Sequence, residues 1–435
     1  MQLDNDCQGQ GFPEMIKRTL LLLVIFLFTI PPSLHAEETI TWQQCLDEAK
    51  QAHPDLYSAL AIIQQAEADR NITSGSRLPQ LSSSVSASRG GTTAKGGSAS
   101  SNYSYALTGK QLLFDGGNIS SRISSTEEAI KASRYNYDLV SSSVRYALRS
   151  AFIQLLKAQD LVGLTREIAD RRRNNVRLIG LRYQGGREHS GSLAQAQADL
   201  AQAEFDYAQA VRGHQLAQSK LASALGRSSR TPLRVSGSFT TGFYAEGRPD
   251  FSSLAKNHPS FRELEVKSKE VHYDLEAAKQ AFSPQLYLTG TAGRNTVDSS
   301  PFDAFDWQAG LTLSVPIYEG GAGKAKVSKA MAVVSQQNAQ EKSGYLDVLD
   351  TLEECWKNYQ DAVQLVGVKR KSLAAAQERS NIANAQYSIG LLAFNEWVII
   401  ENSLVNAKKD YLNAEANLLI AEAQWIQAKG GGLDG

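Results

Sequence analysis

Histidine, cysteine and carboxylate side chains could do chemistry in this chain, but their spacing builds no recognisable reactive site. The six histidines are scattered along it: His35, His53, His189, His214, His258 and His272. No His-Glu-x-x-His or Cys-x-x-Cys pair is present, and no glycine-rich stretch runs into the Lys-Ser or Lys-Thr of a phosphate loop. We therefore expect no enzyme, no catalytic residue, no metal site and no cofactor.

The histidines and cysteines have structural explanations instead. His53 and His258 each precede a proline, a combination that breaks a helix in two. Cys45 and Cys355 are too few for a disulfide framework, and either one disulfide or two buried thiols fits them. Basic and acidic residues balance at 45 each, so the charge gives no indication of a nucleic-acid partner.

The sequence contains one unit twice. Five landmarks recur in the same order 204 or 205 positions later (390 − 186 = 204). They are His53-Pro54 with His258-Pro259, Leu81 with Leu286, Phe114-Asp115-Gly116-Gly117 with Tyr318-Glu319-Gly320-Gly321, Tyr183-x-x-Gly186 with Tyr387-x-x-Gly390, and Gly226 with Gly430. Such a repeat determines the architecture. We divide the chain into a first structural repeat, 37–226, an inter-repeat linker, 227–249, a second structural repeat, 250–430, and a flexible tail, 431–435.

The segment before the first repeat, 1–36, is expected to be an N-terminal extension and a signal peptide. Lys17-Arg18 precede a short apolar run, and Ala36 provides a small residue for cleavage. Because acidic residues precede Met15, translation starts either at Met1 or at Met15. No later stretch is apolar enough for a transmembrane helix.

Two heptad patterns predict long helices that supercoil with their neighbours. In the first repeat the seam is Leu193, Leu200, Tyr207, His214 and Leu221, with Ala196, Ala203, Ala210, Ala217 and Ala224 three residues behind. The second repeat has an equivalent seam from Trp397 to Ala428. An apolar seven-residue repeat favours left-handed coiling, and alanine at every second seam position allows close packing.

A longer helix is expected before each of these, at about 117–184 and 322–388, because both stretches lack proline and hold little glycine. Each would reach roughly 100 Å, about twice the length of the helix that follows. The N-terminal helical stretch of each repeat, 41–77 or 250–282, has the length needed to cover the other half.

Short alternating runs between these helices predict two β-strands in each repeat. Leu81 to Arg89 and Tyr103 to Thr108 form the first pair, and Leu286 to Ala292 and Trp307 to Val315 form the second. Alternation with period two fits transmembrane strands with one lipid-facing side, on which Tyr103, Tyr105 and Trp307 are candidates for an aromatic girdle. Ordinary hairpins on a soluble domain are the alternative.

Four strands cannot close a barrel, and an open sheet edge cannot lie in lipid. The chain therefore has to oligomerise if its strands cross a membrane. Three copies would supply about twelve strands, enough for a narrow water-filled bore. The sequence thus predicts a mainly α fold with a small β part, a duplicated unit of long coiled helical hairpins with two transmembrane strands per repeat, and a homotrimer.

In this arrangement the sequence resembles the TolC-like outer-membrane efflux factors. The resemblance rests on Leu78-Pro79-Gln80-Leu81, Leu113-Phe114-Asp115-Gly116-Gly117, Arg182-Tyr183-x-x-Gly186, Leu225-Gly226 and the second copies of these motifs. It covers the chain from about 38 to 430. It implies a trimer with a twelve-stranded β-barrel in the outer membrane and an α-helical barrel across the periplasm. The implied function is the exit duct of a tripartite efflux or type I secretion system, with a periplasmic adaptor protein, an inner-membrane transporter and outer-membrane lipid as partners.

The resemblance also assigns roles to the two helix-to-helix turns. Adaptor docking is expected at the tips, at Tyr183, Gly186, Tyr387, Gly390 and Leu391, where the glycines are also expected to end helices in the left-handed conformation. Inward bending of the second hairpin would close the bore.

In the family an acidic residue stands six positions after the tip glycine and forms a ring in the closed pore. Those positions hold Ser192 and Glu396 here, so an acidic gate would rest on Glu396 alone. The alternative for Glu396 is a helix N-terminal glutamate stabilised by the macrodipole.

Arginines crowd the approach to the first tip, and Arg173, Arg177, Arg182 and Arg187 would form a basic collar there. Such a collar would steer an acidic adaptor or anionic cargo. A solvated helix face is the structural alternative.

A secreted coiled-coil structural or adhesin protein without a conduit is the rival function. The repeated strand pairs argue against it, because a fibrous stalk has no need of them. The nature of the cargo, the class of pump and the resting state of the pore are open at this level.

Overall fold

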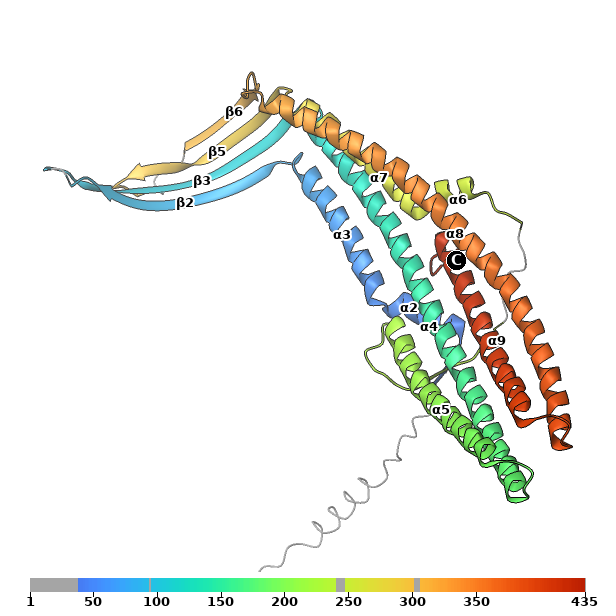
Figure 1. The fold of residues 1–435 in the computed structure, drawn as a ribbon. Coiled ribbons are helices and arrows are strands. Elements are labelled where there is room, and N and C mark those ends of the chain that lie inside the picture. Colours follow the sequence, from blue (N-terminus) through green and yellow to red (C-terminus); the bar gives the residue numbers. More distant parts are fainter. Residues whose placement is uncertain (1–37, 94, 240–246, 301–305, 435) are drawn as a thin grey trace, which may run out of the picture.

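The computed structural model describes residues 38–93, 95–239, 247–300 and 306–434, and the proposed signal peptide lies outside these ranges. Figure 1 shows an elongated molecule with a curved sheet at one end and a layer of long helices extending from it. The two predicted repeats are present. Each contributes a broken helix, two strands, a very long helix and a shorter returning helix, in that order.

The long helices run the whole length of the helical part. They are α4 (Asn118–Gln184) and α8 (Ala322–Ser388), each with 67 residues. The returning helices are α5 (Ser190–Ala224) and α9 (Phe394–Ala428), each with 35 residues. The predicted boundaries are therefore close to the observed ones. The predicted seams are buried or half-buried, since the seam alanines of α5 from Ala196 to Ala217 are almost covered.

The glycine pair before each long helix makes the turn from strand to helix. Gly116 and Gly117 have φ angles of +67° and +93°, and Gly320 and Gly321 have +62° and +85°. These angles lie in the left-handed region, which favours glycine. In the first repeat the Asp115 carboxylate also accepts hydrogen bonds from backbone N–H groups at the start of α4.

The upper half of each long helix is covered by a helix broken at proline. The pieces are α2 (Trp42–Ala52) and α3 (Pro54–Gly75) in the first repeat, and α6 (Phe251–Asn257) and α7 (Pro259–Gln280) in the second. The predicted break is confirmed at both His-Pro pairs. The imidazole Nδ1 of His53 accepts from the Asp55 N–H at 3.2 Å, and His258 accepts from Ser260 at the same distance. These histidines cap helices.

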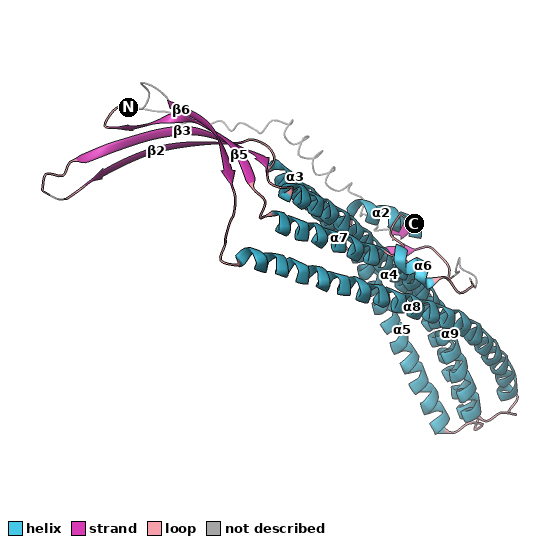
Figure 2. Ribbon diagram, turned by 90° about the horizontal axis from the view of Figure 1, so that it is seen from above, coloured by secondary structure: helices cyan, strands magenta, loops and turns pink. Residues whose placement is uncertain are grey.

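The four long strands form one antiparallel sheet. They are β2 (Gln80–Gly91), β3 (Ala99–Phe114), β5 (Gln285–Val297) and β6 (Asp306–Ser314), in the order β2-β3-β5-β6. Both predicted pairs are present, and β3 pairs with β5 to join the repeats. Figure 2 shows the sheet curving away from the helices, with β2 and β6 as its two unpaired edges.

The sheet has one apolar and one polar face, because directly paired residues point to the same side. The pairs Val85–Tyr105, Leu107–Ala292 and Leu288–Leu311 belong to the apolar face. The neighbouring pairs belong to the polar face: Ser82–Thr108, Ser86–Ser104, Thr108–Thr291 and Thr291–Gln308. All three residues proposed for an aromatic girdle, Tyr103, Tyr105 and Trp307, share the apolar face toward the end of the sheet away from the helices.

A short parallel pair of strands near the middle of the helical layer was not predicted. β1 (Glu38–Ile40) pairs with β4 (Leu233–Val235), which lies inside the segment proposed as a linker. Three residues per strand are too few to show a periodic pattern. Residues 240–246 of that segment lie outside the described ranges.

The proposed flexible tail, 431–435, needs correction for its described part, because this part packs against α4. Leu433 is buried, and its backbone N–H donates to the Ser141 hydroxyl at 2.9 Å. Asp434 pairs with Lys50 at 2.8 Å. A buried leucine with a satisfied backbone anchors a chain end, which composition alone did not indicate.

The helices form a single curved layer that changes partners half-way along (Figure 1). Next to the sheet the order is α3-α4-α7-α8, and at the far end it is α5-α4-α9-α8. The layer therefore has open edges on the same two sides as the sheet: β2, α3 and α5 on one side, β6 and α8 on the other. None of the described helices combines the length and the apolarity needed to cross a membrane.

Candidate functional site at the helical tips

Both helical hairpins end in the same hydrogen-bonded turn. In the first, the N–H groups of Gly186 and Arg187 donate to the carbonyls of Tyr183 and Arg182 at 3.0 and 2.8 Å. In the second hairpin Gly390 and Leu391 donate to Tyr387 and Gln386 at 3.1 and 2.9 Å. This is the Schellman pattern, in which the glycine adopts a left-handed conformation. The φ angles of +68° at Gly186 and +82° at Gly390 confirm the predicted helix ends.

The residues proposed for adaptor docking divide between surface and interior. Tyr183, Gly186, Gly390 and Leu391 are exposed, and 75 % of Leu391 is accessible. Tyr387 is not on this surface, because only 1 % of it is exposed. The repeat-equivalent tyrosines Tyr183 and Tyr387 thus occupy different environments.

Tyr387 instead forms the centre of an aromatic cluster inside the second tip. Its ring stacks on Trp397, with centroids 4.5 Å apart and planes inclined by 7°. Its hydroxyl donates to Glu188 of the first hairpin at 2.8 Å, and its carbonyl accepts from Arg182 at the same distance. Burial and this hydrogen bond to a carboxylate raise the pKa of the Tyr387 phenol. Two residues of the first hairpin therefore hold the second.

A buried ion pair makes a further link between the hairpins. Arg171 of α4 contacts Glu401 of α9 through Nε, 2.8 Å from Oε2, and through Nη2, 3.0 Å from Oε1. Only 1 % of Glu401 is exposed. Ser380 of α8 donates to the same carboxylate at 2.5 Å, and Asn384 of α8 at 3.3 Å. A buried carboxylate with this many donors favours one arrangement of the three helices α4, α8 and α9.

The two positions proposed for the gate also differ. Glu396 lies exposed in the first turn of α9, and in the described part of the chain it makes no hydrogen bond or ion pair. Ser192 is buried at the start of α5, where its N–H donates to the His189 Nδ1 at 3.2 Å. The geometry leaves the Glu396 carboxylate free to face solvent or a pore, while Ser192 belongs to a helix cap.

The four proposed collar arginines are not equivalent. Arg173 pairs with Asp170 and Glu204, at 2.7 and 3.0 Å. Arg182 is half-buried, and its guanidinium lies over the Tyr387 ring, 4.5 Å from the centroid. The other two, Arg177 and Arg187, are exposed at the tip, and no ion pair within the described residues involves them. Unbalanced positive charge at this tip therefore resides on these two side chains.

The Arg171–Glu401 link was missed in the sequence, although a signal for it is present. The repeat-equivalent positions hold Ala375 and Gln197, so neither charge has a charged counterpart in the other repeat. An unmatched charge on the packed side of a helix is the signal for a contact that the two copies do not share. Glu401 also lies four residues after the seam residue Trp397, on the packed side of the helix.

The tips contain charged and aromatic groups but no reactive constellation. Across the described ranges, no three histidine, cysteine or carboxylate side chains gather where they could hold a metal ion. Cys45 and Cys355 are free thiols in different repeats, and burial raises the pKa of both. The arrangement is suited to holding two hairpins together and to presenting a surface.

Comparisons with known proteins agree with this geometry. In sequence, the chain is 23 % identical over 408 residues to the outer membrane efflux protein BepC of Brucella suis, covering 88 % of this chain and 85 % of that protein. In structure, it is similar to CusC, with a TM-score of 0.82, 18 % identity and coverage of 90 % and 92 % of the two chains. The open outer membrane channel MtrE of Neisseria gonorrhoeae gives a TM-score of 0.79 at 22 % identity, over 90 % and 89 %.

Both structural repeats match one family, described as outer membrane efflux protein, at residues 45–227 and 251–431. The expectations of outer-membrane location, efflux function and TolC-like fold are thereby confirmed, and the adhesin alternative receives no support. The chain belongs to the outer membrane efflux protein family.

Proposed function

We propose that three copies of the chain form a continuous duct, with a barrel of about twelve strands in the outer membrane and a helical barrel in the periplasm. The observation that carries this proposal is the pair of matching open edges. β2, α3 and α5 lie at one side of the protomer, and β6 and α8 at the other. A head-to-tail interface between these sides satisfies every edge only when the ring closes.

The two faces of the sheet indicate which side of the closed ring would face lipid and which would face the bore. The face with Leu107, Leu288 and Leu311 suits lipid, and the face with Ser86 and Thr291 suits a water-filled bore. Such a duct would pass cargo generically. Selection of drug, metal or protein would lie with the pump.

The tips are proposed to dock a periplasmic adaptor that connects the duct to an inner-membrane transporter. Tyr183, Leu391 and the exposed side chain of Ile389 provide apolar area at the end farthest from the sheet. The two Schellman glycines fix the shape of that surface. Arg177 and Arg187 add positive charge beside the first tip, where an acidic adaptor segment or anionic cargo would be attracted.

The proposed duct predicts both a mass and a conductance. The purified protein in mild detergent should have the native mass of three chains, and it should form ion-conducting channels in planar lipid bilayers. A coiled-coil stalk without a conduit would give no conductance at any protein concentration. An ordered monomer with its strands intact would contradict the proposed closure.

We also propose Glu396 as the acidic residue of the pore, where symmetry would bring three carboxylates together. Negative charge in a narrow bore attracts cations. Glu396→Gln should therefore reduce cation selectivity and weaken block by multivalent cations, with little effect on assembly, because the side chain has no partner in the described protomer. Because Glu396 is the only acidic residue proposed for the gate, the loss of cation selectivity should be smaller than in a gate with two rings of acidic residues.

The measurement is the reversal potential of the wild type and the variant across the same salt gradient. Glu378→Gln, an exchange at an exposed glutamate on α8, serves as the control. Equal reversal potentials for wild type and Glu396→Gln would show that Glu396 faces away from the lumen.

A further inference from the structure

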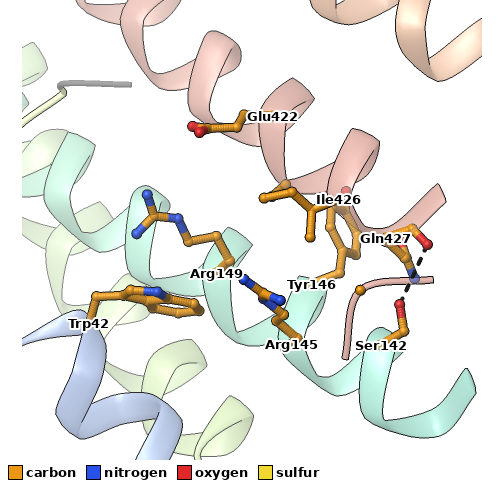
Figure 3. A pocket seen from close by; sticks show the side chains of 10 residues that line it. Trp42, Ser142, Arg145, Tyr146, Arg149, Glu422, Ile426 and Gln427 are labelled. Carbon is orange, nitrogen blue, oxygen red and sulfur yellow. Dashed lines mark hydrogen bonds between the residues drawn. The ribbon is translucent and has the colours of Figure 1, made fainter. Parts of the chain in front are cut away.

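A cavity lined by charged and aromatic side chains lies in the middle of the protomer, far from the tips and from the sheet. It has a volume of about 220 Å³ and is lined by residues of α2, α4, α9 and the loop after α9. Figure 3 shows Trp42, Arg145, Arg149 and Glu422 around it. The volume exceeds what a single water needs, so the cavity has room for a small solute.

The wall formed by α4 presents two guanidinium groups to the cavity. Arg145 and Arg149 are four residues apart, which places them one turn apart on the same helix face. Arg145 donates one hydrogen bond, from Nη1 to the Gly432 carbonyl at 2.7 Å. Arg149 lies against Trp42, with Cζ 4.8 Å from the ring centroid, and against Phe152 at 5.9 Å. Aromatic rings hold this cation in place, but they provide no counter-charge.

Neither arginine has an acidic partner at ion-pair distance. Within the described chain no carboxylate oxygen comes within 4.0 Å of Arg145 or Arg149. Burial lowers the pKa of both guanidinium groups. At Arg149 the nearby Glu422 carboxylate partly offsets this lowering of the pKa, and Arg145 adds to it. Glu422 is buried on the opposite wall, and burial raises the pKa of its carboxyl group. Arg145 and Arg149 thus face one carboxylate, that of Glu422, which lies beyond ion-pair distance of both.

The place of the cavity separates it from the sheet, the part of the molecule proposed to lie in lipid. Arg145 lies 27 positions after the start of α4 at Asn118, a distance of roughly 40 Å along the helix from the sheet. α4 and α9 are the inner helices of the layer, whereas α5 and α8 are its edges. A solute that enters the cavity would come from the aqueous phase.

We propose that this cavity binds a small oxyanion of the phosphate class between Arg145 and Arg149. Guanidinium groups one turn apart can share an anion with several oxygens, and planar guanidinium donors match its geometry. Trp42 holds the Arg149 guanidinium in place, and the Ser142 hydroxyl lies on the same wall of the cavity, formed by α4. The bound anion joins α2, α4 and the anchored end of the chain where the helices change partners.

Inorganic phosphate is the probe, and equilibrium dialysis of the purified full-length protein in detergent is the primary measurement. Sodium chloride at equal ionic strength provides the background. We expect saturable binding that approaches one phosphate per chain, together with an increase in the unfolding temperature of about 2 °C or more at saturation. Absence of saturable binding at millimolar phosphate would overturn the proposal.

Three variants separate a specific site from general attraction. Arg149→Gln should weaken phosphate binding at least tenfold, whereas Arg166→Gln, at an exposed arginine elsewhere on α4, should leave it unchanged. Glu422→Gln should tighten binding several-fold, because it removes a negative charge that repels the anion. The proposal is contradicted if Arg149→Gln binds like the wild type or if Glu422→Gln weakens binding. Because dialysis of the wild type tests binding directly, an unstable variant does not remove the test.

Discussion

Leu107→Arg is expected to abolish assembly in the outer membrane. Leu107 lies in the central strand β3, half-exposed on the apolar face, and pairs with Ser83 and Ala292. An arginine on the lipid face near the bilayer midplane costs about 2–4 kcal/mol. In a closed trimer that cost would apply three times, which is comparable with the whole stability of many folded domains.

The adjacent residue provides a matched control. Thr108 points to the opposite face and pairs with Ser82 and Thr291. Thr108→Arg should still assemble, because a water-filled bore accepts the charge, and it should lower cation conductance. The trimer in outer-membrane fractions is quantified by native gel electrophoresis for both variants. Wild-type levels of the Leu107→Arg trimer would show that this face does not contact lipid.

The sequence predicted the fold well because its strongest signals are repeated. Each helix break, strand pair and glycine turn occurs twice with an offset of 204 or 205 residues, so an ambiguous pattern in one repeat is resolved by the other. The predicted breaks at Pro54 and Pro259 depend only on local backbone chemistry, and the heptads depend only on period. These features are local, and the structure confirms them.

Features that depend on contacts between distant segments were missed. β1 and β4 have three residues each and are held by pairing with one another, not by propensity. Leu433 is buried only because Ser141 and its neighbours on α4 provide a place for it. The glycine-rich composition of the tail, 431–435, predicts flexibility as long as the surface of α4 on which it packs is unknown.

The proposed site residues also divide into those set by local backbone chemistry and those set by contacts between distant segments. The left-handed glycines Gly186 and Gly390 could be predicted, because one residue carries the conformational requirement. The burial of Tyr387 could not, since its twin Tyr183 has the same sequence motif and is exposed. The environment of each tyrosine is set by the neighbouring hairpin. The order of the helices in the layer, which decides that neighbour, is not encoded in any local sequence pattern.

The second large effect is expected at the buried link between the hairpins. Glu401→Ala removes a carboxylate that accepts from Arg171 and Ser380, and it leaves the Arg171 guanidinium without a counter-charge. Breaking a buried pair in this way costs about 3–5 kcal/mol. Because 30 % of the Arg171 side chain is exposed, we expect about 2 kcal/mol, which corresponds to roughly a thirtyfold shift in the equilibrium between joined and separated hairpins.

If the second hairpin closes the pore, this shift should be visible as an increase in channel open probability in planar bilayers. Lys369→Ala is the control, since its partner Asp410 is half-exposed and belongs to the same hairpin. Exposed pairs contribute little, so this variant should behave like the wild type. The double variant Arg171→Ala/Glu401→Ala should open less often than Glu401→Ala, because neither charge is then left unpaired. Equal open probability in wild type and Glu401→Ala would mean that the link supports the fold without restraining the tip.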